Sequence, residues 1–373
     1  TTSYGIACGE KGIQVLGELH FPDSLGLFYS SFTYFLGFEV NSGEYKLMGL
    51  APYGEPVYVP LIKKHIVDIK EDGSIFLNMD YFSFLEGKKM TNSKFADLFD
   101  GPERSGESEI TRREMNLAAS IQSVAEEIVI KMANNAYKIT GKKYLVMSGG
   151  VALNCVSNGK LFKETPFLDF FFQPASGDAG GAIGCALNWF YENYPHVPKS
   201  SQPNPYLGPC FSNSEIIAFL ETKGLNYHKF EDESRASKLS KMLAENNIVG
   251  HFDGRMEFGP RALGNRSIIA NPLNVEMQSK LNLKIKYRES FRPFAPIYAE
   301  ERTSEYFDFD RPSPYMLVVR NVVDNLLVKN KTEVAESDNL IELINLRRSD
   351  LPAITHIDNS ARLQSVNEKQ NKR

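Results

Sequence analysis

The sequence contains no run of about 18 apolar residues, so it offers no candidate for a membrane-spanning helix and predicts no membrane partner. Its four cysteines are scattered, and none belongs to a C-x-x-C pair. This usage is typical of reduced thiols in a cytoplasmic protein rather than of a disulfide framework or a zinc site. The six histidines form no H-x-x-H or H-x-x-x-H pair, which argues against a complete histidine-rich metal site within this chain.

The sequence also lacks a surplus of basic charge. The 42 Lys and Arg residues face 46 Asp and Glu residues, which gives a net charge of −4. Nucleic-acid-binding proteins usually carry a basic surplus, so no nucleic-acid partner is expected, although a local cationic pocket is compatible with this balance. At 373 residues, of which 42% are hydrophobic, the chain is long enough for two domains with separate cores.

Hydrophobic periodicity predicts several elements in the first half of the chain. The opening residues suggest two strands joined by a turn at residues 9–12. Residues 110–140 carry apolar side chains at helical spacing and are followed by Gly141, which predicts a long helix. Apolar runs at residues 144–147 and 167–172 are each followed by a glycine-containing turn and a helical pattern. Two such units in succession predict a parallel or mixed sheet covered by helices.

A change in composition marks a boundary in the middle of the chain. Residues 195–209 are rich in Pro, Ser, Asn and Gln, which is typical of a linker. Ser212 and Glu215 then form the capping-box pattern that begins a helix. We therefore predict an α/β domain, a linker and a second α/β domain, at residues 1–194, 195–211 and 212–373.

The first glycine turn, SGGVALN, follows a predicted strand and opens a predicted helix. Gly149 and Gly150 allow close backbone approach to a ligand, and the free N–H groups of a helix start favour an anion. The segment, which runs from Ser148 to Asn154, matches neither a P-loop nor the dinucleotide fingerprint. A tight turn that uses glycine only for packing is an equally good interpretation.

Two further segments carry a charged residue among glycines. SGDAGGAIG places Asp178 after Gly177 at a helix start, where its carboxylate is either the N-cap or a ligand for a cation or hydroxyl. GEYKLMGLAPYGEP contains Lys46, which without further context fits a surface lysine in a turn rich in Gly and Pro.

The stretch FDGRMEFGPRALGNRS is unusually rich in arginine for a loop. Arg255, Arg261 and Arg266 are separated by glycines that allow tight turns. Asp253 and Glu257 could pair with Arg255 and Arg266, which leaves Arg261 as the best candidate for a substrate contact.

A second cationic segment, KIKYRESFRPFAP, follows. In a strand, alternation would place Lys284, Lys286 and Arg288 on one face, with Arg292 close behind. Such a face repels itself unless an anion is present, and arginine suits phosphate and carboxylate oxygens. A solvated face balanced by nearby glutamates is the alternative. The segment THIDNSARLQ adds two residues that either approach this pocket or occupy ordinary surface or strand positions, His356 and Arg362.

Taken together and in order, five motifs closely resemble the carbamoyltransferase family typified by nodulation protein U and by antibiotic O-carbamoyltransferases. They are FPDSLGLFYSSFTYFLGFEVNSGEYKLMGLAPYGEP, SGGVALNCVSNGK, PASGDAGGAIG, GRMEFGPRALGNRS and KIKYRESFRPFAP, and they span almost the whole chain. The resemblance implies an actin- and sugar-kinase-like α/β domain followed by a partial YrdC-like α/β domain, similar to the domain that makes threonylcarbamoyl-adenylate.

The resemblance also implies an activity. ATP and carbamoyl phosphate would form carbamoyl-adenylate in the second domain. The carbamoyl group would then pass to a hydroxyl of a sugar or natural product in the first domain, beside a divalent metal such as Fe(II), with Mg²⁺ as a further candidate. The matching residues are Asp178 for the metal; Lys46, Ser148, Gly149, Gly150, Asn154, Gly177 and Arg362 for the nucleotide or adenylate; and Arg261, Lys286, Arg288 and Arg292 for the phosphates and catalysis.

The chain departs from the family pattern at both ends. It opens without methionine, the family's paired histidines precede its first residue, and the family's Asn-Thr-Ser-Phe-Asn motif follows Arg373. We therefore expect an internal fragment with half a metal site and an open synthesis pocket. Two alternatives stay open: an actin-fold sugar kinase or phosphotransferase, which leaves the cations after residue 250 unexplained, and a non-catalytic nucleotide-binding module. The acceptor and the oligomeric state are not specified by the sequence.

Overall fold

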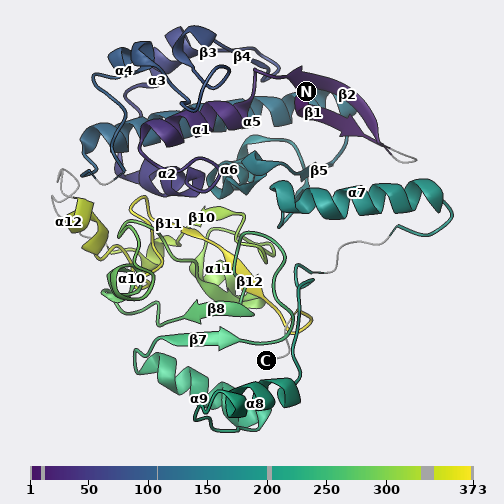
Figure 1. Ribbon diagram of the computed structural model, residues 1–373, viewed down its shortest axis with the longest axis vertical. Helices are drawn as coiled ribbons and strands as arrows, with labels where there is room; N and C mark the ends of the chain where they lie inside the picture. Colours follow the sequence, from purple (N-terminus) through teal and green to yellow (C-terminus); the bar gives the residue numbers. More distant parts are fainter. Residues whose placement is uncertain (1, 10–12, 107, 200–203, 329–339, 371–373) are drawn as a thin grey trace.

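The computed structural model describes residues 2–9, 13–106, 108–199, 204–328 and 340–370 (Figure 1). The first part of the chain contains β1 (Thr2–Cys8), β2 (Gln14–His20), α1 (Leu25–Phe35), α2 (Glu44–Leu50), α3 (Val59–Leu61), β3 (Val67–Ile69), β4 (Ile75–Leu77), α4 (Ser93–Leu98), α5 (Arg112–Thr140), β5 (Tyr144–Met147), α6 (Cys155–Glu164), β6 (Asp169–Phe172) and α7 (Asp178–Asn193). The second part contains α8 (Asn213–Thr222), α9 (Asp232–Ala244), β7 (Val249–Phe252), β8 (Arg266–Ile269), α10 (Met277–Lys280), β9 (Ile297–Ala299), α11 (Thr303–Tyr306), β10 (Val319–Asn321), α12 (Leu340–Asn345), β11 (Ser360–Arg362) and β12 (Gln364–Val366).

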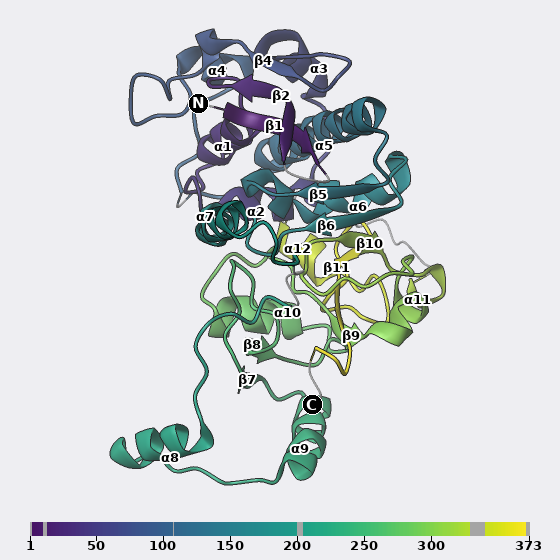
Figure 2. The same ribbon diagram turned by 90° about the vertical axis from the view of Figure 1, so that its right-hand side faces the viewer.

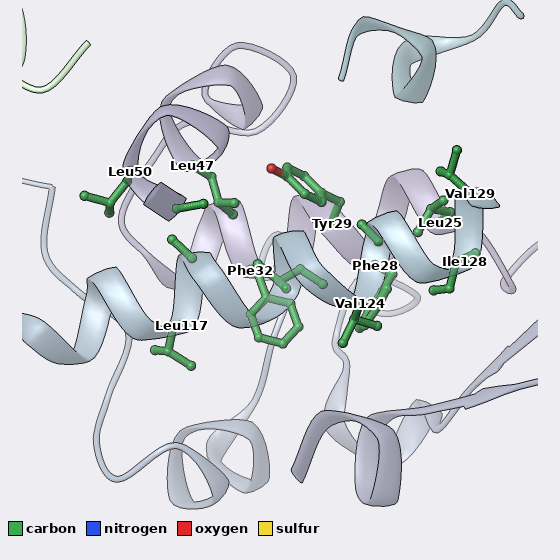
Figure 3. Packing of buried hydrophobic residues seen from close by; sticks show 14 of the residues in the cluster. Leu25, Phe28, Tyr29, Phe32, Leu47, Leu50, Leu117, Val124, Ile128 and Val129 are labelled. Atoms are coloured by element: carbon green, nitrogen blue, oxygen red, sulfur yellow. The ribbon is translucent and has the colours of Figure 1, made fainter. Parts of the chain in front are cut away.

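The core of the first part forms where α1 packs on the long helix α5 (Figure 3). Helix α5 begins at a capping box between Thr111 and Glu114. It ends before Gly141, as the sequence predicts, and the φ of 61° at this glycine is left-handed. Fully buried Phe28 and Phe32 extend from α1 into this core. The 3.6-residue period of both helices thus decides which side chains leave water.

Parallel pairing is confirmed for β5 and β6, whose register matches Tyr144 with Asp169 and Met147 with Phe172. The described strands form two-stranded sheets, both parallel and antiparallel, rather than one large sheet. A mixed α/β architecture is therefore confirmed, whereas the actin-like and YrdC-like assignments stay predictions. The two strands expected at the start of the chain pair as antiparallel β1 and β2, whereas residues 10–12 of the turn expected between them lie outside the described residues.

The second part begins with two helices at one end of the molecule. Helix α8 starts at the predicted capping box, in which the Ser212 backbone N–H donates to Glu215 Oε2 at 2.7 Å. Figure 2 shows α8 projecting away from the rest of the chain, while β7 and β8 lie between α9 and the first part. In the described part of the chain, no helix has both the length and the apolar character needed to cross a membrane.

Helix α6 joins the two parts. The Asn158 side chain donates to the Leu317 carbonyl at 3.0 Å, and Arg320 donates to the Gly159 carbonyl at 3.1 Å. A Cβ at position 159 would lie 2.1 Å from the Val319 carbonyl oxygen, so only glycine permits this approach. One hydrophobic cluster includes residues from Leu25 to Leu363 and thus from both parts. The division at residues 195–211 stays an interpretation of the sequence.

Candidate functional site

A cavity of about 1710 Å³, called the large cavity below, lies between the two parts of the chain. Eleven of the twelve predicted site residues line it: Ser148, Gly149, Gly150, Asn154, Gly177, Asp178, Arg261, Lys286, Arg288, Arg292 and Arg362. The fold therefore brings together residues that are far apart in the sequence. The exception is Lys46, whose ammonium group donates to Glu289 Oε1 at 2.7 Å.

The glycine turn forms one wall of the large cavity. Gly149 has a φ of 95°, a conformation that favours glycine, and its N–H donates to the Ser176 carbonyl at 2.9 Å. Residues 150–153 form a 3₁₀ turn, and the α-helix begins only at Cys155, later than the sequence suggested. Exposed backbone from Ser148 to Gly150 thus faces the cavity.

Asn154 shapes this wall through its side-chain amide. Its Oδ1 accepts from the Ser157 N–H at 3.1 Å and caps α6, while its Nδ2 donates to Gln122 Oε1 at 3.0 Å. The amide is therefore engaged with protein groups, so Asn154 positions the turn even though it lines the large cavity.

Asp178 lies at the N-terminus of helix α7. Of its two interpretations from the sequence, the one in which its carboxylate is the N-cap is wrong. Gly177, with an extended backbone, occupies the N-cap position, and Asp178 is the first helical residue. Its exposed carboxylate lines the large cavity. No group of three or more His, Cys, Asp or Glu residues in the described ranges is placed to hold a metal ion. A single carboxylate does not fit a metal centre, so we assign no step to a metal.

Arg261 connects the second part to the glycine turn. Its Nη2 donates to the Leu153 carbonyl at 2.9 Å, and its buried Nε has no hydrogen-bond partner in the described structure. Gly259, with a φ of 130°, permits the approach, because a Cβ there would lie 2.9 Å from the Pro174 carbonyl oxygen. The guanidinium thus forms part of the boundary between the two walls.

Glu257 organises the loop that carries Arg261, a role that the sequence did not reveal. This buried carboxylate accepts from the backbone N–H groups of Leu263 and Asn265, each at 2.8 Å, and of Arg266 at 3.2 Å. Three donors to one carboxylate oxygen fix the turn in place of an ion pair.

The other two arginines of the loop are structural, but with different partners from those expected. Arg266 donates to the Asp253 carbonyl at 2.8 Å, and its guanidinium lies 3.6 Å from the centre of the Phe252 ring. Arg255 is exposed and donates to the Leu207 carbonyl at 3.1 Å. Neither of them lines the large cavity.

The prediction that Lys284, Lys286 and Arg288 share one face of a strand is wrong. Residues 281–285 form a π-helical turn that continues α10, and the Lys286 N–H donates to the Leu281 carbonyl at 2.9 Å. Buried Met277 and Leu281, four residues apart, decide the conformation because helical spacing places both on one apolar face. Lys286 and Arg288 still line the large cavity, whereas Lys284 does not.

Asn282 holds the segment that follows, and sequence reasoning missed it. Its fully buried amide accepts from Arg288 Nε at 2.7 Å and donates to the carbonyls of Ser290 and Arg292, each at 2.9 Å. In the sequence, the only sign of this role is an Asn followed within ten residues by two arginines. The spacing of these residues does not reveal the hydrogen bonds that the Asn282 side chain makes.

The cations of the large cavity repel one another. Burial, together with the nearby charges of Arg261, Arg288 and Arg292, lowers the pKa of Arg362 to about 10. Burial, with a further contribution from Arg292, also lowers the pKa of Arg288 to about 10. Partial burial followed by the fields of Arg288 and Arg292 lowers the pKa of Lys286. Burial is the largest cause of each shift, and the mutual repulsion of the cations adds to it.

Glu289 is the carboxylate nearest to these cations. It pairs with Lys46 at 2.7 Å and with Arg292 at 3.4 Å. Burial raises its pKa, but the hydrogen bond from Lys46 and the nearby charges outweigh burial and leave the pKa below its ordinary value. No ion pair in the described part of the chain involves Arg261, Lys286, Arg288 or Arg362.

His356 is not an ordinary surface residue. Burial lowers its pKa to about 4; Asp358 opposes this shift, and Arg362 and Arg348 reinforce it. Its Nε2 is buried without a hydrogen-bond partner in the described structure. Arg362, on β11, likewise has a buried and unpartnered Nε. The sequence placed both residues near the pocket only as one of two options, and the structure supports that option.

Family models place the chain in a defined class. Residues 1–187 match the carbamoyltransferase N-terminus, and residues 240–373 match the carbamoyltransferase C-terminus. The chain belongs to the carbamoyltransferase family. It is 53% identical over 362 residues to the uncharacterized protein sll1178 of Synechocystis, with 95% of this chain and 59% of that protein covered.

Two named relatives extend the comparison. Nodulation protein NolO of Bradyrhizobium diazoefficiens is 35% identical over 98% of this chain and 62% of its own length. Nodulation protein U of Sinorhizobium fredii is 32% identical over 67% of this chain and 39% of its own length. The chain thus spans less than two thirds of the length of these relatives.

Proposed function

We propose that the chain is part of an O-carbamoyltransferase that uses ATP and carbamoyl phosphate to carbamoylate a hydroxyl of a small-molecule acceptor in the cytoplasm. The observation that carries the proposal is the group of cations around the large cavity, in which Arg261, Lys286, Arg288 and Arg362 have no ion-pair partner among the described residues. Arg261, Arg288 and Arg362 are partly buried and Lys286 is exposed. Cations that converge on one cavity without a partner favour a polyanionic ligand, and both substrates supply phosphate oxygens for them.

The proposed chemistry balances in two steps. One carbamoyl phosphate, one ATP and one water give carbamoyl-adenylate, pyrophosphate and phosphate. The acceptor hydroxyl then takes the carbamoyl group, and AMP leaves. The guanidinium groups would offset the repulsion between the two anionic substrates and stabilise pyrophosphate as it departs. The exposed backbone at residues 148–150 lines the same cavity and suits the nucleotide end of the adenylate.

Calorimetric titration with carbamoyl phosphate and, separately, with ATP tests the proposal. We expect the wild-type chain to bind both, and Arg261→Ala to weaken at least one by about tenfold. Arg255→Ala is the matched control, because this exposed arginine from the same loop does not line the large cavity. A wild-type chain that binds neither ligand would contradict the proposal.

The alternatives make different predictions. Phosphate transfer from ATP to a sugar without carbamoyl phosphate would favour a sugar kinase. Tight ATP binding that neither Arg261→Ala nor Lys286→Ala weakens would favour a non-catalytic nucleotide-binding module. Carbamoyl-phosphate binding that depends on Arg261 excludes both alternatives as complete descriptions of the site.

A further inference from the structure

A second, smaller cavity of about 80 Å³, called the inner cavity below, adjoins the large one. The two cavities share several lining residues: Tyr45, Met48, Arg288, Arg292, Pro293 and Arg362. The guanidinium groups therefore lie at the junction, and His356 lines only the inner cavity. A space of this size has room for a small planar group.

Two residues of the inner cavity carry buried polar atoms without a hydrogen-bond partner in the described structure, Arg362 at Nε and His356 at Nε2. A buried polar atom without a partner costs about 1–3 kcal/mol, so such atoms call for an explanation. Arginine Nε–H can only donate. Whether His356 Nε2 donates or accepts a hydrogen bond therefore decides which ligand can bind to both Arg362 Nε and His356 Nε2.

The hydrogen bonds of His356 define that character. Ser360 Oγ donates to Asp358 Oδ1 at 2.6 Å, and a serine hydroxyl has a single hydrogen to donate. The contact of 2.9 Å between His356 Nδ1 and Ser360 Oγ therefore requires Nδ1 to carry the proton. With its pKa near 4, the ring is neutral at pH 7, and Nε2 is left with a lone pair.

We propose that His356 is a specificity-determining residue whose Nε2 accepts a hydrogen bond from the amide N–H of a carbamoyl group bound in the inner cavity. The guanidinium groups at the junction, Arg362 among them, would hold the phosphate of the same ligand. Acyl phosphates such as acetyl phosphate have a methyl group in place of the amide and leave Nε2 unpartnered, so the site disfavours them. This inference rests on the proposed function, because it needs the phosphate at the guanidinium groups.

Two stable analogues test the inference on the chain as it exists. Phosphonoacetamide and acetonylphosphonate differ only in an amide NH₂ against a methyl group. By calorimetry, we expect the wild type to bind the amide about tenfold more tightly or better. His356→Leu should bind both analogues equally, with an affinity close to that of the wild type for the ketone. His356→Gln should regain part of the preference, because its amide oxygen replaces the acceptor near the position of Nε2.

The outcomes separate this inference from the proposed function. If the wild type binds neither analogue, the phosphate site fails and the role of His356 fails with it. If the wild type binds both equally, the cationic site stands and the assignment of His356 is overturned. A preference for the amide that persists in His356→Leu also overturns it. Should His356→Leu not fold, the wild-type comparison and His356→Gln still decide the question.

Discussion

Polar side chains in the core around α1 and α5 are hydrogen-bonded to one another, whereas two arginines in the cationic wall of the large cavity keep polar atoms without a partner in the described structure. The cationic wall consists of Arg261, Lys286, Arg288, Arg292 and Arg362. In the core, the Tyr29 hydroxyl donates to Gln122 Oε1 at 2.8 Å, and Gln122 donates to Glu126 Oε1 at 2.7 Å. In the wall, the Nε atoms of Arg261 and Arg362 are buried without partners in the described structure.

The difference indicates that the core serves the stability of the fold and the cationic wall serves the binding of a ligand. A network of polar groups that are all hydrogen-bonded within a packed core stabilises the folded state, and it leaves no donor or acceptor for a ligand. Unpaired cations weaken the folded state, and an anion that pairs with them relieves this cost. Substitutions in the two regions should therefore change the free energy of unfolding in opposite directions and differ in their effect on anion binding.

The largest expected effect is in the core. Phe32 is fully buried, and its ring lies 5.0 Å from that of Phe95 and 5.5 Å from that of Phe99. Phe32→Ala should lower the free energy of unfolding by about 3–5 kcal/mol in urea titrations. The control Phe76→Ala removes a half-exposed ring from β4 and should cost less than about 1 kcal/mol. Equal losses for the two variants would contradict the placement of the core.

The next effect is a pH dependence that comes from the inner cavity beside this wall, where His356 lies. The unfolded state binds a proton on His356 near its ordinary pKa of about 6.5, whereas the folded state resists protonation down to about pH 4. The stability that His356 contributes is thus present above about pH 6.5 and is lost as the pH falls, by up to roughly 3 kcal/mol at pH 4.

Urea titrations at about pH 7, 5.5 and 4.5 measure this loss. His356→Leu should show a flatter pH profile than the wild type, since other titrating groups contribute equally to both. Identical profiles would mean that the imidazole is accessible to protons in the folded state.

A smaller effect distinguishes the two arginines of the loop. Arg266 bonds backbone carbonyls and stacks on Phe252, so Arg266→Ala should lower the free energy of unfolding by about 1–2 kcal/mol. Carbamoyl-phosphate affinity should stay within about twofold of the wild type. Arg261→Ala should show the reverse pattern, a small stability change and a large loss of affinity. Calorimetry and urea unfolding of both variants check the contrast.

The smallest effect has the opposite sign. Arg362→Met replaces an unpaired buried cation by an apolar side chain of similar length, so the free energy of unfolding should rise by about 1 kcal/mol. Stabilisation of the fold by added pyrophosphate should fall at the same time. Arg347→Met, which removes an exposed arginine paired with Asp350, is the control and should change neither quantity measurably. Destabilisation by Arg362→Met would show that its charge is satisfied.

The sequence predicts local structure well where the signal is local. Helix α5 follows from its apolar period and Gly141, and α8 follows from Ser212 and Glu215. It fails at residues 284–288, where alternation predicts a strand but the burial of Leu281 and Met277 against Ala353 imposes a helical turn. The deciding partner lies far along the chain, beyond the reach of periodicity.

The candidate site shows the same limit. Residue type and motif order select Arg261, Arg288 and Arg292 correctly as residues that line one cavity. The supports of that cavity, Glu257 and Asn282, act through backbone hydrogen bonds that no spacing rule reveals. Nor does any spacing rule reveal the role proposed for His356, because that role depends on a single buried atom, Nε2, that has no hydrogen-bond partner in the described structure.

The close approach of Gly159 to the Val319 carbonyl has a consequence for how the chain must be assembled. The ring of Phe162 in the same helix lies 5.2 Å from that of Phe309, so the two parts share aromatic packing. A cut within residues 204–211 would leave each piece with one face of a common core in water. The face of α6 that carries Gly159 and Phe162 is therefore buried only after the second part of the chain has packed against it, whereas the core between α1 and α5 needs no residue of the second part.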